Sequence, residues 1–144
     1  MKPTVWLRIA SVVTLVHSAL HTIGGVFGKM PAGPAGVAVA AMQPNHFRFM
    51  GSMRTMWDFH LGMGLAVTIF LTVEGIVFWQ FGSLIKREGA ALRPVLAVFA
   101  AGYIAFAAVS LLYFFTLSSI FELLIAALLV MAMASARREA AAAS

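Results

Sequence analysis

Residues 94–136 read PVLAVFAAGYIAFAAVSLLYFFTLSSIFELLIAALLVMAMASA and contain two long apolar runs, separated by the short segment FTLSS. Each run approaches the roughly 20 residues that a helix needs to cross the hydrocarbon core of a bilayer. Neither run shows the strict alternation of a half-buried strand, so both are predicted to be helices. FTLSS is little more than a turn, and the two helices are therefore expected to run in opposite directions.

Two further runs of this kind lie nearer the N-terminus. Residues that start or stop helices flank the runs, such as Pro3 before the first, Gly82 and Ser83 after the second, and Pro94 at the third. Backbone groups inside a bilayer must be satisfied within the spanning segment, which favours helices. We therefore predict an all-α integral membrane four-helix bundle, with helices at residues 5–27, 56–82, 94–115 and 119–136.

The composition agrees with a polytopic membrane protein. Of the 144 residues, 62% are hydrophobic and 10% charged, whereas a soluble domain has roughly 25% charged residues. We expect one transmembrane domain covering residues 1–144, with the lipid bilayer as its surroundings. There is no cysteine, which excludes disulfides, thiolate metal sites and thiol catalysis. The motifs of common soluble enzymes are absent, and whether the protein is an enzyme stays open.

The positions of the basic residues predict the orientation. With four spans, one side of the membrane holds seven of them and the opposite side holds Lys29, Arg48 and Arg54. By the positive-inside rule both termini are cytoplasmic and the loop 28–55 is external. The positions of the charges matter more than their sum of +5, and we expect no nucleic-acid partner. A bacterial inner membrane fits this pattern. The seven residues are Lys2, Arg8, Lys86, Arg87, Arg93, Arg137 and Arg138.

Two further interpretations concern the first predicted span and the loop that follows it. The first apolar run could be a secretory signal peptide, but it is long for one and histidines interrupt it. In the external loop, the apolar patch 37–42 is predicted to be a helix lying at the membrane surface. The aromatic residues Phe47 and Phe49 then give the loop a reason to dock on the bundle.

Histidines mark the candidate site. His17 and His21 are four residues apart, so on a helix they share a face, together with Thr14, Gly24 and Gly28. The G-x-x-x-G pair on this face is expected to allow close approach of a neighbouring helix. His60 lies near the start of the second span, at a depth where it could meet His21, and Asp58 points the opposite way.

Ionisable groups within a bilayer are expensive and by default indicate a site. We predict a metal or cofactor site in the outer half of the bundle, with His17, His21 and His60 as ligands and His46 or Asp58 as a fourth. Nearby methionines suggest a transition metal with copper-like chemistry. Alternatively, one of the histidines is the axial ligand of haem or a chlorin.

Two further interpretations need no metal. His17, His21 and Glu74 could line a proton relay or a small-ligand pocket; Glu74 lies about 21 Å along the helix from His60, too far to share an ion with it. The histidines could instead form hydrogen bonds between helices, in a homo-oligomer or an accessory or structural subunit of a larger membrane complex. Glu122, three residues after Ser119, is predicted to form a capping box at the start of the fourth helix.

The segments RFMGSMRTMWDFHLGMGL (residues 48–65) and HTIGGVFG (residues 21–28) resemble two motif regions of a family of small, uncharacterised bacterial integral membrane proteins. The resemblance extends over most of the chain. It implies four membrane helices, in agreement with the prediction from the apolar runs. It implies no activity.

Overall fold

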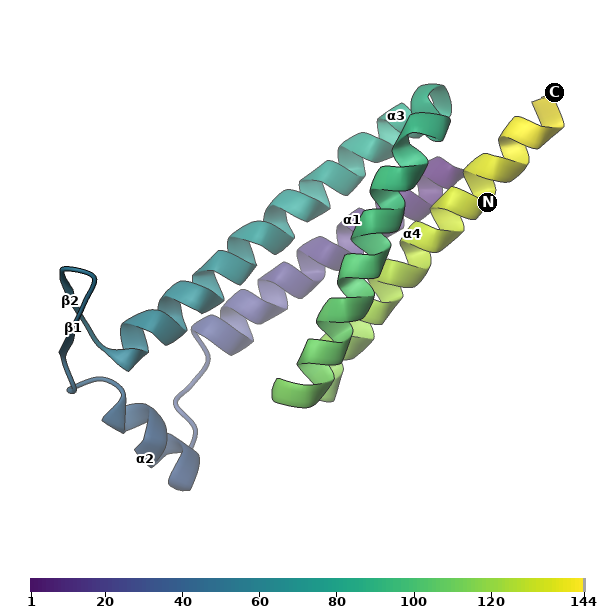
Figure 1. Ribbon diagram of the computed structural model, residues 1–144. Helices are drawn as coiled ribbons and strands as arrows, with labels where there is room; N and C mark the ends of the chain where they lie inside the picture. The colour runs from purple at the N-terminus through teal and green to yellow at the C-terminus, as the bar shows by residue number, and fades with distance from the viewer. Residues whose placement is uncertain (144) are drawn as a thin grey trace. The chain divides into compact units, whose positions relative to one another are not determined.

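The computed structural model of the chain describes residues 1–143 and is mostly helical, as predicted. Within this range three helices are long and apolar enough to cross a membrane. Figure 1 shows the elements, which are α1 (Pro3–Leu20), η1 (His21–Val26), α2 (Pro34–Ala41), β1 (Phe47–Phe49), β2 (Ser52–Arg54), α3 (Met56–Tyr113) and α4 (Thr116–Ala143).

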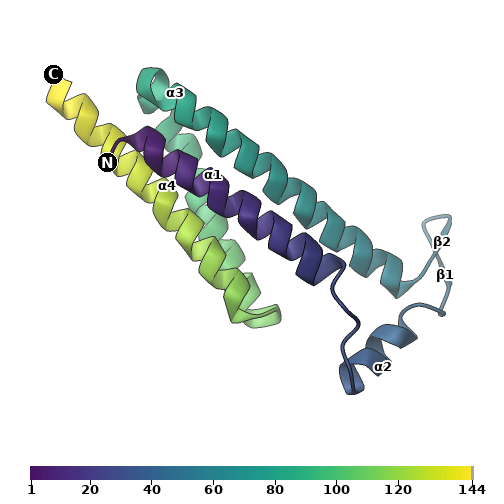
Figure 2. The ribbon, with the colours of Figure 1, turned by 180° about the vertical axis from the view of Figure 1, so that it is seen from behind.

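Helix α3 contains two of the predicted spans, because it is helical over 58 residues apart from Glu88. The φ and ψ angles of Glu88 are −114° and 25°, outside the helical region. Phe81 packs against Phe99 and Phe78 packs against Tyr103, so residues further before Glu88 meet residues further after it and the two halves of α3 are antiparallel. The chain therefore reverses direction near Glu88, as Figure 2 also shows.

The prediction of a loop at residues 83–93 was wrong, because this segment is helical except at Glu88. Gly82 does not end the helix. It makes room for α1, since a Cβ atom at Gly82 would lie 3.1 Å from Nε of Arg8. Pro94 likewise lies inside the helix instead of opening it, so these two sequence signals were misinterpreted.

The chain divides into two compact units. Unit 1 contains residues 1–17 and the described residues from Leu71 onward, and unit 2 contains residues 18–70. In unit 1, the start of α1, both halves of α3, and α4 pack around a core of buried apolar side chains. Examples of these side chains are Leu7, Phe78, Leu96, Ile125 and Leu129.

Small residues allow α1 and α3 to approach closely in unit 1. Ser11 Oγ donates a hydrogen bond of 2.6 Å to the carbonyl oxygen of Gly75. A Cβ atom at Gly75 would lie only 2.7 Å from Cγ of Leu15. Glycine therefore sits where a larger residue would push the two helices apart.

Unit 2 contains the end of α1, η1, α2, a β-hairpin and the start of α3. The predicted surface helix at residues 37–42 corresponds to α2, which begins three residues earlier. The hairpin was not predicted. Its strands are joined by Met50 and Gly51, whose φ angles of 47° and 87° are those of a two-residue turn with positive φ at both positions.

The predicted close approach at Gly24 is absent from unit 2, since nothing lies within 4 Å of where its Cβ atom would be. The wide π-helical turn η1 explains the difference, because the backbone N–H of Phe27 bonds to the carbonyl oxygen of Thr22, five residues back. Residues beyond His21 therefore do not follow the angular spacing of an α-helix. The close approach occurs at Gly64, where a Cβ atom would lie 3.0 Å from Val26.

Candidate functional site: a buried carboxyl group in unit 1

Glu122 lies in the core of unit 1 and is fully buried. Its Oε1 atom accepts a hydrogen bond of 2.8 Å from Ser110 Oγ, in the second half of α3. The same atom accepts a bond of 2.9 Å from Ser118 Oγ, one turn earlier in α4. Its other oxygen, Oε2, is buried and has no hydrogen-bond partner among residues 1–143.

The predicted capping box of Ser119 and Glu122 was wrong. Helix α4 begins at Thr116, before Ser119, so Glu122 lies beyond the first helical turn. Ser119 Oγ is buried and has no hydrogen-bond partner in the described part of the chain. Only the packing of α4 against α3 shows that the Glu122 side chain points into the core.

Ser118 connects His17 to the carboxyl group of Glu122. His17 is only 6% exposed, and its ring stacks on the ring of Phe121, with 5.1 Å between the centroids. Ser118 Oγ is 3.5 Å from His17 Nε2, at the outer limit of a hydrogen bond, and 2.9 Å from Glu122 Oε1. Ser118 therefore stands between an imidazole and a carboxyl group.

A second carboxyl group of unit 1 is also held by a hydroxyl group. Tyr103 donates a hydrogen bond of 2.5 Å to Oε2 of Glu74, joining the two halves of α3. The sequence drew attention to Glu74 as an acidic residue in an apolar run but missed Tyr103. An isolated tyrosine in the small, apolar stretch AAGYIAFAA was the available signal.

His21 belongs to unit 2 and takes part in a polar seam between the end of α1 and the start of α3. Its Nε2 atom lies 3.1 Å from the carbonyl oxygen of Gly64. Ser18 Oγ donates to the carbonyl oxygen of Thr68, and the hydroxyl groups of Thr22 and Thr68 are 3.0 Å apart. The contact of His21 with a backbone carbonyl of α3 is thus one of the hydrogen bonds between helices that were considered for the histidines.

The other two histidines lie in less enclosed places of unit 2. His60 is exposed, with its ring 5.2 Å from that of Trp57, and His46 is exposed between α2 and β1. Among residues 1–143, no three histidine or acidic side chains are grouped so that they could hold a metal ion. A metal, haem or chlorin at His17, His21, His46 or His60 stays a prediction from the sequence.

Asp58, considered above as a metal ligand, forms a capping box with Thr55 at the start of α3. The capping box predicted from the sequence was that of Ser119 and Glu122 in α4. The Oδ2 atom of Asp58 accepts a bond of 2.8 Å from the backbone N–H of Thr55. In return, the backbone N–H of Asp58 donates to Thr55 Oγ1 over 3.1 Å. This reciprocal pair fits the T-x-x-D pattern at the start of α3, which was present in the sequence and overlooked.

Comparison with known proteins adds no functional information. No protein-family model, no curated protein and no solved structure matches this chain. The resemblance of residues 48–65 and 21–28 to a family of bacterial membrane proteins stays an expectation.

Proposed function

We propose that the protein is an integral membrane protein with both termini in the cytoplasm of a bacterial cell. The length and apolar composition of α1, α3 and α4 support insertion. The basic residues support the orientation, since Lys29, Arg48 and Arg54 all lie in the segment between η1 and α3 and the other seven lie outside it. Gly89 lies close to Ala136, so the bend of α3 and the basic end of α4 share one end of unit 1.

The absence of cysteine makes this orientation testable with single cysteine substitutions. In intact cells, a maleimide that cannot cross membranes should label Ser52→Cys in β2 and leave Lys86→Cys unlabelled until the cells are opened. The parent protein should stay unlabelled throughout. Labelling of both variants in intact cells would contradict the proposed orientation.

Within unit 1, we propose that Glu122 is a proton-binding group and that Ser118 connects it to His17. The observation that carries this proposal is the buried Oε2 atom of Glu122, which has no partner among the described residues. A bare carboxylate is expensive in a membrane interior, and binding a proton removes that charge. Ser118 donates to Oε1, so a proton that arrives through Ser118 is bound at Oε1, and Oε2 then becomes the uncharged carbonyl oxygen of the carboxylic acid.

Ser118 is suited to pass a proton because a hydroxyl group both donates and accepts. A protonated His17 would give its Nε2 proton to Ser118 Oγ while the Ser118 hydroxyl proton moves to Glu122 Oε1. The imidazole then becomes neutral, the carboxylate becomes a carboxylic acid, and the serine is regenerated. No metal or other co-reactant is needed. Of the three residues in the proton relay suggested by the sequence, only His17 takes part here, and Ser118 and Glu122 replace His21 and Glu74.

Infrared difference spectroscopy of the protein in lipid bilayers tests this function. Exchange of H₂O for D₂O should shift a carboxylic-acid C=O band that is missing in Glu122→Gln and persists in Glu139→Gln, whose side chain is exposed. Ser118→Ala should slow the exchange of this proton for deuterium without removing the band. A spectrum unchanged by Glu122→Gln would show that Glu122 does not exchange a proton under these conditions and would overturn the proposal.

A second candidate function is that of an accessory or structural subunit. It is favoured by an exposed face of small residues in α3, where Ala101, Gly102 and Ala105 lie at the surface. Small residues permit close packing of membrane helices. Ala105→Cys should form a disulfide-linked dimer on mild oxidation if the face joins two copies of the chain, whereas Leu84→Cys, on another exposed position, should not.

A further inference from the structure

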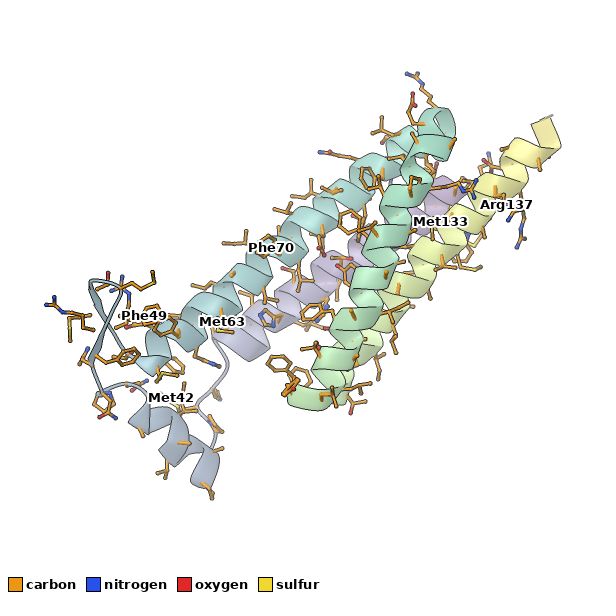
Figure 3. The ribbon with its side chains drawn as sticks, in the orientation of Figure 1. Met42, Phe49, Met63, Phe70, Met133 and Arg137 are labelled. Atoms are coloured by element: carbon orange, nitrogen blue, oxygen red, sulfur yellow. The ribbon has the colours of Figure 1, made fainter. Side chains whose placement is uncertain are left out.

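A cavity in unit 2 lies between the β-hairpin and the start of α3. Its volume is about 470 Å³, within the usual range for small-molecule sites. Figure 3 labels two residues that border it, Phe49 of β1 and Met63 of α3. The other residues that line it are Met50, Ser52, Arg54, Asp58, Phe59, Gly62 and Ala66.

Aromatic contacts hold the hairpin against α3 and so shape this cavity. The ring of Phe59 stacks on Phe47, with 6.0 Å between centroids. The same ring meets the edge of Phe49 at 5.2 Å. The capping box of Thr55 and Asp58 fixes the first turn of α3 beside them. The cavity is thus bordered by two elements that specific contacts connect.

The cavity is polar at one end and apolar at the other. Arg54 and Asp58 supply one positive and one negative charge close to the start of α3. Gly62 and Ala66 follow Asp58 at successive turns, about 6 and 12 Å further along the helix axis. Near Gly62 the space is open, since nothing lies within 4 Å of where a Cβ atom would be.

This gradient matches a phospholipid, and we propose that the cavity binds phosphatidylethanolamine from the external leaflet. The phosphate would meet the Arg54 guanidinium, which suits an oxyanion. The primary ammonium group would donate to Asp58, whose carboxylate has acceptor positions beyond the one that Thr55 uses. The acyl chain would lie along Gly62, Met63 and Ala66.

The lipid class follows from the charges. Phosphatidylglycerol offers no cation for Asp58, and the quaternary ammonium of phosphatidylcholine has no N–H to donate. The proposal rests on membrane insertion of the protein, with the start of α3 near the external surface. It does not depend on proton binding at Glu122.

Native mass spectrometry of the full-length protein in detergent measures lipid retention directly. With the three lipids at equal concentration and with identical acyl chains, phosphatidylethanolamine should be retained about three to five times more than either of the others, as expected for exposed charge pairs. Asp58→Asn, which keeps an acceptor for Thr55, should remove this preference. Arg54→Gln should lower the retention of all three lipids.

Gly62→Leu provides a variant that fills the cavity without altering either charge. It should abolish selective lipid retention, whereas Ala90→Leu, which adds a leucine at an exposed position of α3 outside the cavity, should leave retention as in the parent. Equal retention of the three lipids by the parent, or unchanged retention by Gly62→Leu, would overturn the proposal. So would a dimer of the parent that Gly62→Leu dissociates, because a second copy would then occupy the cavity.

Alkaline extraction of membranes separates this outcome from failure of the proposed membrane location. A protein that stays in the membrane pellet but shows no lipid preference contradicts only the lipid site. A protein released into the supernatant contradicts membrane insertion itself and therefore both proposals.

Discussion

Ser110 donates a hydrogen bond of 2.8 Å to the fully buried carboxyl group of Glu122, and this bond joins the second half of α3 to α4. The two residues are separated by the short connection that follows Tyr113. In an apolar bundle, an acceptor that loses its donor is left unsatisfied, so such a pair contributes to stability through both partners. The bond therefore links the proposed proton site to the packing of the helices.

A double-mutant cycle should detect this bond. Ser110→Ala and Glu122→Leu are each expected to destabilise unit 1, and together they should cost less than the sum of the two, with a coupling of about 1 kcal/mol. Removing both polar groups leaves neither one unsatisfied. Unfolding in mixed micelles with increasing dodecyl sulfate gives the free energies. Strict additivity of the two changes would contradict the bond.

The close approach of α1 and α3 predicts opposite effects at two glycines. Gly75→Ala should destabilise the protein by about 1–3 kcal/mol, because the new Cβ atom would lie 2.7 Å from Leu15. Gly102→Ala should be neutral or slightly stabilising, since its Cβ atom meets open space and alanine favours helix. The same unfolding assay checks both variants, and equal effects would show that α1 does not crowd Gly75.

The capping box at the start of α3 predicts a second contrast. Thr55→Ala should cost about 1 kcal/mol and increase amide hydrogen exchange in the first turn of α3, because a bond to the backbone N–H of Asp58 is lost. Ser119→Ala should have little effect or stabilise slightly, because its buried hydroxyl has no partner within the described residues. A larger loss at Ser119 than at Thr55 would restore the original capping prediction.

The role of His21 can be separated from that of a metal ligand. The Gly64 carbonyl oxygen can only accept, so His21 Nε2 carries the proton of their 3.1 Å contact, and His21→Ala removes that bond. We expect the melting temperature to fall by the same amount with and without added Cu²⁺. A metal ion bound only by the folded protein would instead raise the stability of the parent increasingly as its concentration exceeds Kd, and the variant would not respond. Elemental analysis of the purified protein gives an independent check.

Much of the helical architecture could be predicted because it depends on local chemistry. The first residue of α3, Met56, was predicted correctly, as was the polar face that buries Thr14 and His17. The errors occurred where a residue serves a distant contact. Gly82 seemed to end a helix but accommodates Arg8, and Glu122 seemed to cap a helix but turns into the core.

The candidate site was predictable only in part. The sequence drew attention to His17 and Glu74, because ionisable residues stand out in apolar runs. It did not reveal Ser110, Ser118 or Tyr103, since serine and tyrosine are common in membrane helices and their partners lie on other segments. The hairpin was missed because three-residue strands carry almost no periodic signal.

The sequence by itself determined that the chain is helical and apolar. In an apolar environment the backbone N–H and C=O groups have no water to bond, and a helix satisfies them within the same segment. Only the tertiary structure decided which polar groups meet. Whether Ser118 faces both His17 and Glu122 depends on the rotation of α1 and α4 about their axes and on their offset along the bundle. Those settings result from the packing of many side chains from several segments, and no local pattern in the sequence specifies them.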